Sequence, residues 1–156
     1  MGTPPATYGW QVGQRAPEFS VTTLDGKTVT YSDIYGRGTS ASGRPVMLFF
    51  FATWCGTCRS ELRELREIAP TFEDKLDLVL VSIDPSEPAR DLMTFQQSNG
   101  YPGTVVRANE KFLKDYNVLI RSTKIGIDRE EGIVFRSGYG EVPKGTWEAT
   151  VKALTG

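Results

Sequence analysis

Two strongly apolar runs stand out in the middle of the chain. The letters VMLFFFA occupy residues 46–52 without a polar interruption, and LDLVLVSID occupies residues 76–84 and is mostly apolar. Apolar runs of this length are typical of strands that are covered on both faces of a sheet. The two runs therefore predict two buried strands of an α/β sheet.

A helical pattern lies between these runs. Pro70 limits the helix, because the residue before a proline is disfavoured in helical geometry. The apolar positions recur at helical spacing after Cys55 and are Cys58, Leu62, Leu65 and Ala69. The charged residues between them are expected on the outer sides of the helix and are Arg59, Glu61, Arg63, Glu64, Arg66 and Glu67.

Weaker patterns flank this centre. Asp25-Gly26 lies between two alternating runs and predicts a β-hairpin in which Val29 and Tyr31 share one strand face. The Gly- and Ser-rich residues 35–44 predict a flexible loop. Further strands are expected over 103–107, 122–128 and 132–140, and further helices over 86–98, 108–116 and 144–154. The order predicts an α/β fold in which a late hairpin makes a parallel sheet core mixed.

Length and charge restrict the classes of protein. The 156 residues predict one domain, and 18 basic against 19 acidic residues give no support for nucleic-acid binding. No apolar run approaches the roughly 18 residues that cross a bilayer. The first ten letters, MGTPPATYGW, lack the basic and apolar regions of a signal peptide. We expect a flexible leader over 1–11 and a single domain over 12–156.

Histidine is absent from the sequence. This removes the commonest metal ligand and the usual general base, so Ser-His-Asp and Cys-His chemistries are excluded. Two cysteines alone cannot make a four-ligand zinc site. We expect no metal and no cofactor beyond the cysteine pair itself.

The two cysteines, Cys55 and Cys58, are separated by only two residues. Such a pair can be half of a metal site, a structural disulfide or a redox dithiol. A structural bridge that closes so small a loop stabilises little. Where a strand ends and a helix begins, unpaired N–H groups and the helix dipole favour a thiolate at Cys55, and a thiolate is the form that attacks disulfides. Cys58 follows one turn later and can resolve the mixed disulfide, so we interpret the pair as redox-active.

These motifs resemble the thioredoxin superfamily, and more narrowly its TlpA/ResA branch. WCGTC carries the Trp-Cys-x-x-Cys signature, VGQRAPEFSVTTLDGKTVTYSDI resembles the N-terminal hairpin of the branch, and KDYNV, TKIGID and EEGIVFRSGYG resemble its closing half. The likeness covers residues 12–155. It implies a thioredoxin-like fold with a mixed central sheet flanked by helices and an N-terminal β-hairpin extension. It also implies an extracytoplasmic, usually membrane-anchored thiol-disulfide oxidoreductase.

The resemblance further implies a reductase in which Cys55 is the nucleophile and Cys58 the resolving cysteine. The implied partners are a protein disulfide client, with apocytochrome c as one example, and an upstream membrane or soluble electron donor. The chain itself is expected to be a monomer. Two alternatives stay open, a thioredoxin-like binding module with an idle dithiol and a thiol peroxidase. The APEF letters also occur in peroxiredoxins, but Ala52 stands where those enzymes have a threonine.

The sequence departs from the superfamily at two positions. Ser122, followed by Thr123, stands where a cis-proline is expected to face the cysteines. A cis bond before a non-proline costs about 2.5–4 kcal/mol, so the Arg121–Ser122 peptide is either trans in a shifted loop or strained. We expect the loop to contact the cysteines and the Ser122 hydroxyl to bond a sulfur. The second departure is Phe49, which replaces the buried aspartate of thioredoxin.

Several other residues are candidates for the site. Asp84 and Glu87 are candidates for proton transfer in place of the missing aspartate, although a loop acid or a helix cap fits each equally well. Trp54 is expected in the substrate platform or in the core. Gly56 and Thr57 are expected to tune the potential, the latter by donating to the Cys55 thiolate or simply as a helix residue. Arg59 adds positive charge near the thiols or lies on a solvated face.

Overall fold

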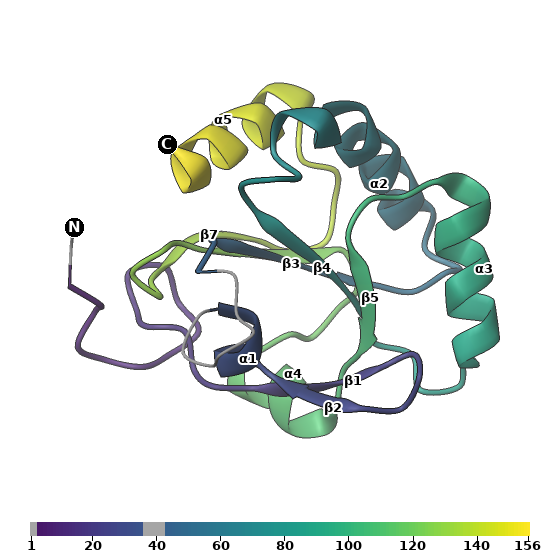
Figure 1. Cartoon of the computed structure of the whole chain (residues 1–156), viewed down its shortest axis with the longest axis horizontal. Helices are drawn as coiled ribbons and strands as arrows, with labels where there is room; N and C mark the ends of the chain where they lie inside the picture. The colour runs from purple at the N-terminus through teal and green to yellow at the C-terminus, as the bar shows by residue number, and fades with distance from the viewer. Residues whose placement is uncertain (1–2, 36–42) are drawn as a thin grey trace.

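The computed structural model describes residues 3–35 and 43–156, which form one seven-stranded sheet with helices on both faces (Figure 1). The strands are β1 (Ser20–Thr23), β2 (Thr28–Thr30), β3 (Val46–Phe51), β4 (Asp77–Ser82), β5 (Thr104–Arg107), β6 (Thr123–Ile127) and β7 (Ile133–Ser137). The helices are α1 (Tyr31–Tyr35), α2 (Gly56–Ile68), the 3₁₀ turn η1 (Ala69–Thr71), α3 (Ala89–Asn99), α4 (Glu110–Asp115) and α5 (Lys144–Thr155). No helix among these residues is both long and apolar enough to span a bilayer.

The sheet has the order β2-β1-β5-β4-β3-β6-β7. The three central strands β5, β4 and β3 are parallel, while β6 pairs antiparallel with β3 and β7 antiparallel with β6. The N-terminal hairpin adds to the other edge through β1, antiparallel to β5. The predicted mixed sheet and hairpin extension are therefore confirmed.

The two strongly apolar runs form β3 and β4, because alternate side chains of each strand enter different cores. Phe49 and Phe51 pack under α2, α3 and α5, whereas Leu48 and Phe50 pack against α1 and α4. Figure 1 shows α2 and α5 above the sheet and α1 and α4 below it. All six residues of β3 are buried, which fixes the end of this strand, and thus the start of α2, rigidly in the sheet.

The predicted elements agree with the structure except at one place. Tyr31 begins the short helix α1 instead of continuing the hairpin strand. The hairpin pairing ends at Thr30, whose amide donates to the Asp33 carboxylate 3.0 Å away, while the Asp33 amide returns a bond to the Thr30 hydroxyl. This reciprocal cap starts a helical turn. The loop predicted over 35–44 falls largely outside the described residues.

The N-terminal segment packs against the far edge of the sheet. The Gly13 amide donates to the Ile133 carbonyl at 2.9 Å, and the Ala16 amide donates to the Glu131 carbonyl at 2.8 Å. Within the expected leader, the Arg136 guanidinium lies 5.0 Å from the ring centre of Trp10. The described part of residues 1–11 thus contacts the domain, and the division at residue 12 stays a prediction.

Candidate functional site

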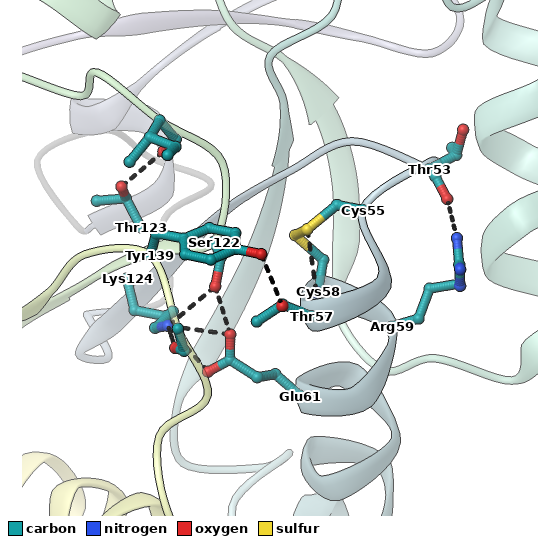
Figure 2. Close-up of a disulfide and its surroundings, with 12 residues drawn as sticks. Thr53, Cys55, Thr57, Cys58, Arg59, Glu61, Ser122, Thr123, Lys124 and Tyr139 are labelled. Carbon is teal, nitrogen blue, oxygen red and sulfur yellow. Dashed lines mark hydrogen bonds and ion pairs between the residues drawn. A yellow bond between two sulfur atoms is a disulfide. The ribbon is translucent and has the colours of Figure 1, made fainter.

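Both cysteines lie at the start of α2 and are joined by a disulfide (Figure 2). Cys55 is the N-cap of the helix, and its sulfur accepts the Cys58 amide at 3.1 Å. The two residues are 2% and 0% exposed respectively, so Cys55 is the outer one. The cap bond and the helix dipole both favour negative charge on the Cys55 sulfur.

The segment before Cys55 is held by polar contacts. Thr53 donates from both its amide, at 3.0 Å, and its hydroxyl to the carboxylate of Glu87. The Thr53 carbonyl accepts from the Arg59 guanidinium at 2.8 Å. The Trp54 indole N–H donates to Asp84 at 2.8 Å. These contacts fix the turn between β3 and α2.

Asp84 and Glu87, the two candidates for proton transfer, therefore hold the turn, and neither bonds a sulfur. Hydrogen bonds from Ser86 and from the Trp54 indole hold the pKa of Asp84 below its usual range. Glu87 is 8% exposed, and its backbone carbonyl accepts from Arg107 at 2.7 Å. A relay role for either acid stays a prediction.

A buried charged cluster lies one turn beyond Cys58, and we name it the Glu61 cluster, made of Glu61, Ser122 and Lys124. All three residues are 0% exposed. The Lys124 ammonium lies 2.9 Å from each carboxylate oxygen of Glu61, and the Ser122 hydroxyl donates to the same carboxylate at 2.6 Å. Figure 2 shows the cluster between α2 and the strand that carries Lys124. The expectation that Glu61 lies on the outer side of the helix is wrong.

The Glu61 cluster joins three segments of the chain. The Val142 amide donates to Glu61 at 3.1 Å, and Lys124 donates to the carbonyls of Gly138 and Gly140 at 3.2 and 2.7 Å. The cluster thereby ties the cysteine helix to β6 and to the loop between β7 and α5. Burial raises the pKa of the Glu61 carboxyl and lowers the pKa of the Lys124 ammonium, while their mutual attraction offsets part of each shift.

The loop before β6 differs from the expected cis-proline geometry. No peptide bond among the described residues is cis, and Ser122 adopts a left-handed backbone with φ of 66°. Its amide donates to the Phe50 carbonyl at 2.7 Å, and its hydroxyl bonds Glu61 and Lys124 instead of the expected sulfur. The neighbouring Thr123 caps the loop by donating to the Ile120 carbonyl at 2.7 Å. The Arg121–Ser122 peptide is therefore trans, and the strained cis alternative is wrong.

Two exposed rings and a half-buried arginine meet near the start of α2, and we name this set the aromatic rim, made of Trp54, Arg121 and Tyr139. The Arg121 guanidinium carbon lies 4.8 Å from the ring centre of Trp54 and 5.0 Å from that of Tyr139. The rings are 56% and 51% exposed. The Thr57 hydroxyl donates to the Tyr139 hydroxyl at 3.1 Å, so it faces the rim instead of the Cys55 sulfur (Figure 2). Gly56, at the first helical position, is exposed.

The sequence contained a usable signal for the Glu61 cluster. Glu61 lies three residues after Cys58 and four before Leu65, so it falls on the apolar stripe of the helix. Ser122 and Lys124 are two apart, which places them on one strand face. No local pattern marks Arg121 or Tyr139, because the rim forms only when residues 54, 121 and 139 meet in space.

Comparison with known proteins assigns the family. Residues 12–137 match the AhpC/TSA family. The chain belongs to the AhpC/TSA family. The thiol-disulfide oxidoreductase ResA of Bacillus thuringiensis is 29% identical over 93% of this chain and 79% of its own length. The thioredoxin-like protein YneN of Bacillus subtilis is 30% identical over 87% of this chain and 76% of its own length.

The fold of this AhpC/TSA-family chain is also that of known structures. A thiol:disulfide interchange protein of the thioredoxin family from Chlorobium tepidum superposes with a TM-score of 0.74, covering 91% of this chain and 96% of that one at 23% identity. The thioredoxin-like fold is thus confirmed. With its ResA-like relatives and the Cys55–Cys58 disulfide, the chain is a thiol-disulfide oxidoreductase.

Proposed function

We propose that this oxidoreductase reduces disulfides in client proteins, with Cys55 as the attacking and Cys58 as the resolving cysteine. The observation that carries the assignment of roles is the position of Cys55, which caps α2 with its sulfur and is the outer of the two residues. A sulfur that accepts an amide at a helix N-terminus is favoured as a thiolate, and the thiolate is the reactive form.

The reaction begins from the reduced pair. The Cys55 thiolate attacks one client sulfur, the client disulfide breaks, and the second client sulfur leaves and takes a proton. Cys58 then loses its proton and attacks the Cys55 sulfur of the mixed disulfide. The first client sulfur leaves as a thiolate, which takes up a proton, and Cys55 and Cys58 form the disulfide. Two electrons pass to the client, and an upstream dithiol donor restores the reduced pair.

The wider setting is proposed from the family likeness. The dithiol is the only redox group needed, so no metal or organic cofactor takes part. The TlpA/ResA resemblance supports an extracytoplasmic location, a monomeric chain, a membrane or soluble electron donor, and clients such as apocytochrome c. Each is tested separately from the chemistry of the cysteine pair.

Trapping distinguishes the roles of the two cysteines. A reduced Cys58→Ser variant is expected to accumulate a mixed disulfide with a disulfide-bonded client such as insulin, because nothing resolves it. A Cys55→Ser variant is expected to accumulate none, since the remaining sulfur lies inside the helix and lacks the N-cap position that favours a thiolate. Mass spectrometry counts both adducts. Equal trapping by the two variants contradicts the assigned order.

Two assays test the proposed direction and the alternatives. Equilibrium with glutathione is expected to give a potential near thioredoxin's roughly −270 mV, whereas a value near −120 mV would indicate an oxidant. Acceleration of insulin reduction by dithiothreitol is expected, and an idle binding module would give none. No peroxide consumption is expected, because buried Ala52 provides no hydroxyl three residues before Cys55.

A further inference from the structure

The arginine of the aromatic rim lies against two aromatic rings. Its guanidinium lies about 5 Å from two aromatic ring centres, 4.8 Å for Trp54 and 5.0 Å for Tyr139. Each ring is itself fixed, since the indole of Trp54 bonds Asp84 and the hydroxyl of Tyr139 bonds Thr57. The cation–π contacts restrain the guanidinium without using its hydrogen-bond donors.

Within residues 3–35 and 43–156, no hydrogen bond or ion pair reaches the Arg121 guanidinium. In the part of the chain that the structure describes, the Arg121 Nε is buried without a hydrogen-bond acceptor, and no carboxylate pairs with the guanidinium. Asp84, which contacts the rim through the Trp54 indole, accepts from Trp54 and Ser86. A fixed and partly buried guanidinium without a counter-charge matches one ligand group best, a carboxylate that accepts two parallel hydrogen bonds.

Arg121 contacts residues that adjoin the two cysteines in the sequence. Trp54 directly precedes Cys55, and the rim contact Thr57 lies between the two cysteines. Leu119 and Ile120 precede Arg121 and are 84% and 42% exposed, so the same loop offers apolar surface. A client segment bound at Cys55 would meet an apolar patch and a cation together.

We infer that Arg121 is the specificity-determining residue of this oxidoreductase and binds a client carboxylate. The client is a protein segment with an aspartate or glutamate within a few residues of its reactive cysteine and an apolar side chain beside it. This inference rests on the proposed function, because it names the client chemistry of the same cysteine pair.

The test uses two disulfide-bonded peptides that are identical except for one position. Both carry a leucine near the reactive cysteine, and two residues from that cysteine one has aspartate and the other asparagine. The full-length reduced protein reacts with each in a single turnover, and chromatography gives the second-order rate constants. We expect the aspartate peptide to react about tenfold faster, as a charge-assisted bidentate contact predicts. Equal rates for the two peptides overturn the inference.

Two variants test whether Arg121 causes the preference for the aspartate peptide. In Arg121→Gln the ratio of the two rate constants is expected to fall to about one. Arg121→Lys is expected to keep part of the preference for the aspartate peptide, because the lysine ammonium retains the positive charge but cannot make the bidentate contact of a guanidinium. The preference of the unchanged protein is expected to weaken at high salt, as screening requires. A variant that merely loosens the fold slows both peptides alike and leaves the ratio unchanged, and an unchanged ratio in Arg121→Gln overturns the inference.

A neutral substrate separates this inference from the proposed function. Bis(2-hydroxyethyl) disulfide carries no carboxylate, so its reduction by the unchanged protein reports the chemistry of the cysteine pair without the Arg121 contact. If the unchanged protein reduces neither this compound nor the peptides, the proposed function fails. If it reduces all of them and shows no aspartate preference, only the assignment of Arg121 fails.

Discussion

Two cations lie close to the disulfide, and their surroundings are opposite. Lys124, in the Glu61 cluster, is fully buried and donates to a carboxylate, a hydroxyl and two carbonyls. Arg121, in the aromatic rim, is partly exposed and contacts two rings. A cation whose bonds are all satisfied inside the chain holds segments together, whereas a cation restrained but not neutralised is available to a partner.

The largest expected effect on stability follows from changing the buried cation, Lys124. Lys124→Met leaves the Glu61 carboxylate buried without its counter-charge, and breaking such a pair costs about 3–5 kcal/mol of unfolding free energy. Urea unfolding of the oxidised protein measures it. The matched change at the rim, Arg121→Met, removes the cation–π contacts to Trp54 and Tyr139 and is expected to cost about 1–2 kcal/mol. Similar losses for the two variants would remove the distinction between the cations.

A double variant tests whether an unpaired buried charge causes the loss of stability. Glu61→Leu combined with Lys124→Met replaces both charges by apolar side chains, and such replacements are often close to neutral. We expect the double variant to be more stable than Lys124→Met alone by about 1–3 kcal/mol, because no buried charge is left unpaired. Unfolding in urea tests this, and additive losses from the two changes would show that the pair itself is not the source of the stability.

A smaller effect is expected where the rim contacts α2. Tyr139→Phe removes the hydroxyl that accepts from Thr57 and keeps the ring beside Arg121, so it should cost about 0.5–1 kcal/mol. Tyr139→Ala also removes the cation–π contact and should cost about 0.5–1 kcal/mol more. Unfolding curves of both variants give the difference. Equal losses would mean that the ring contributes nothing to holding Arg121.

The smallest effect concerns pH and the Trp54 indole. The folded pKa of Asp84 is lowered by the bonds from Ser86 and Trp54, so their contribution is complete above the unfolded value of 3.8 and is lost as the pH falls through the folded pKa below it. The NMR signal of the Trp54 indole N–H should therefore titrate with a midpoint below pH 3.8. Asp84→Asn should abolish this titration, and a midpoint above 3.8 would contradict the assigned contacts.

Sequence patterns predicted the sheet better than the site. The runs that form β3 and β4 were recognisable because β3 is entirely apolar and β4 is apolar between its ends, and α2 because its apolar residues recur at helical spacing. Tyr31 was misassigned because it continues an alternating run, whereas local capping at Asp33 decides its conformation. Glu61 was assigned to the outer side because a charge in a helix usually faces water.

The site residues divide by the range of their interactions. The Cys55 cap is local, since its partner amide is three residues away, and the strand-to-helix junction predicted it. The partners of Glu61 come from β6 and from the loop before α5, and pairing of this kind leaves no trace in a short window. The same holds for Arg121, because one of the rings that it contacts, Trp54, lies far before it in the sequence and the other, Tyr139, lies after it.

The opening segment of the chain has a consequence for self-association. Residues 13–16 hydrogen-bond along residues 131–133, at the outer side of the last strand. Unpaired N–H and C=O groups at the edge of a sheet can pair with a strand of another copy of the chain. A segment that covers the edge prevents this association. Trimming the chain past Ala16 would uncover that edge. The residues that cover the start of this edge strand thus lie far along the chain from the sulfur chemistry, and an affinity tag placed directly before Gly13 would disturb that cover.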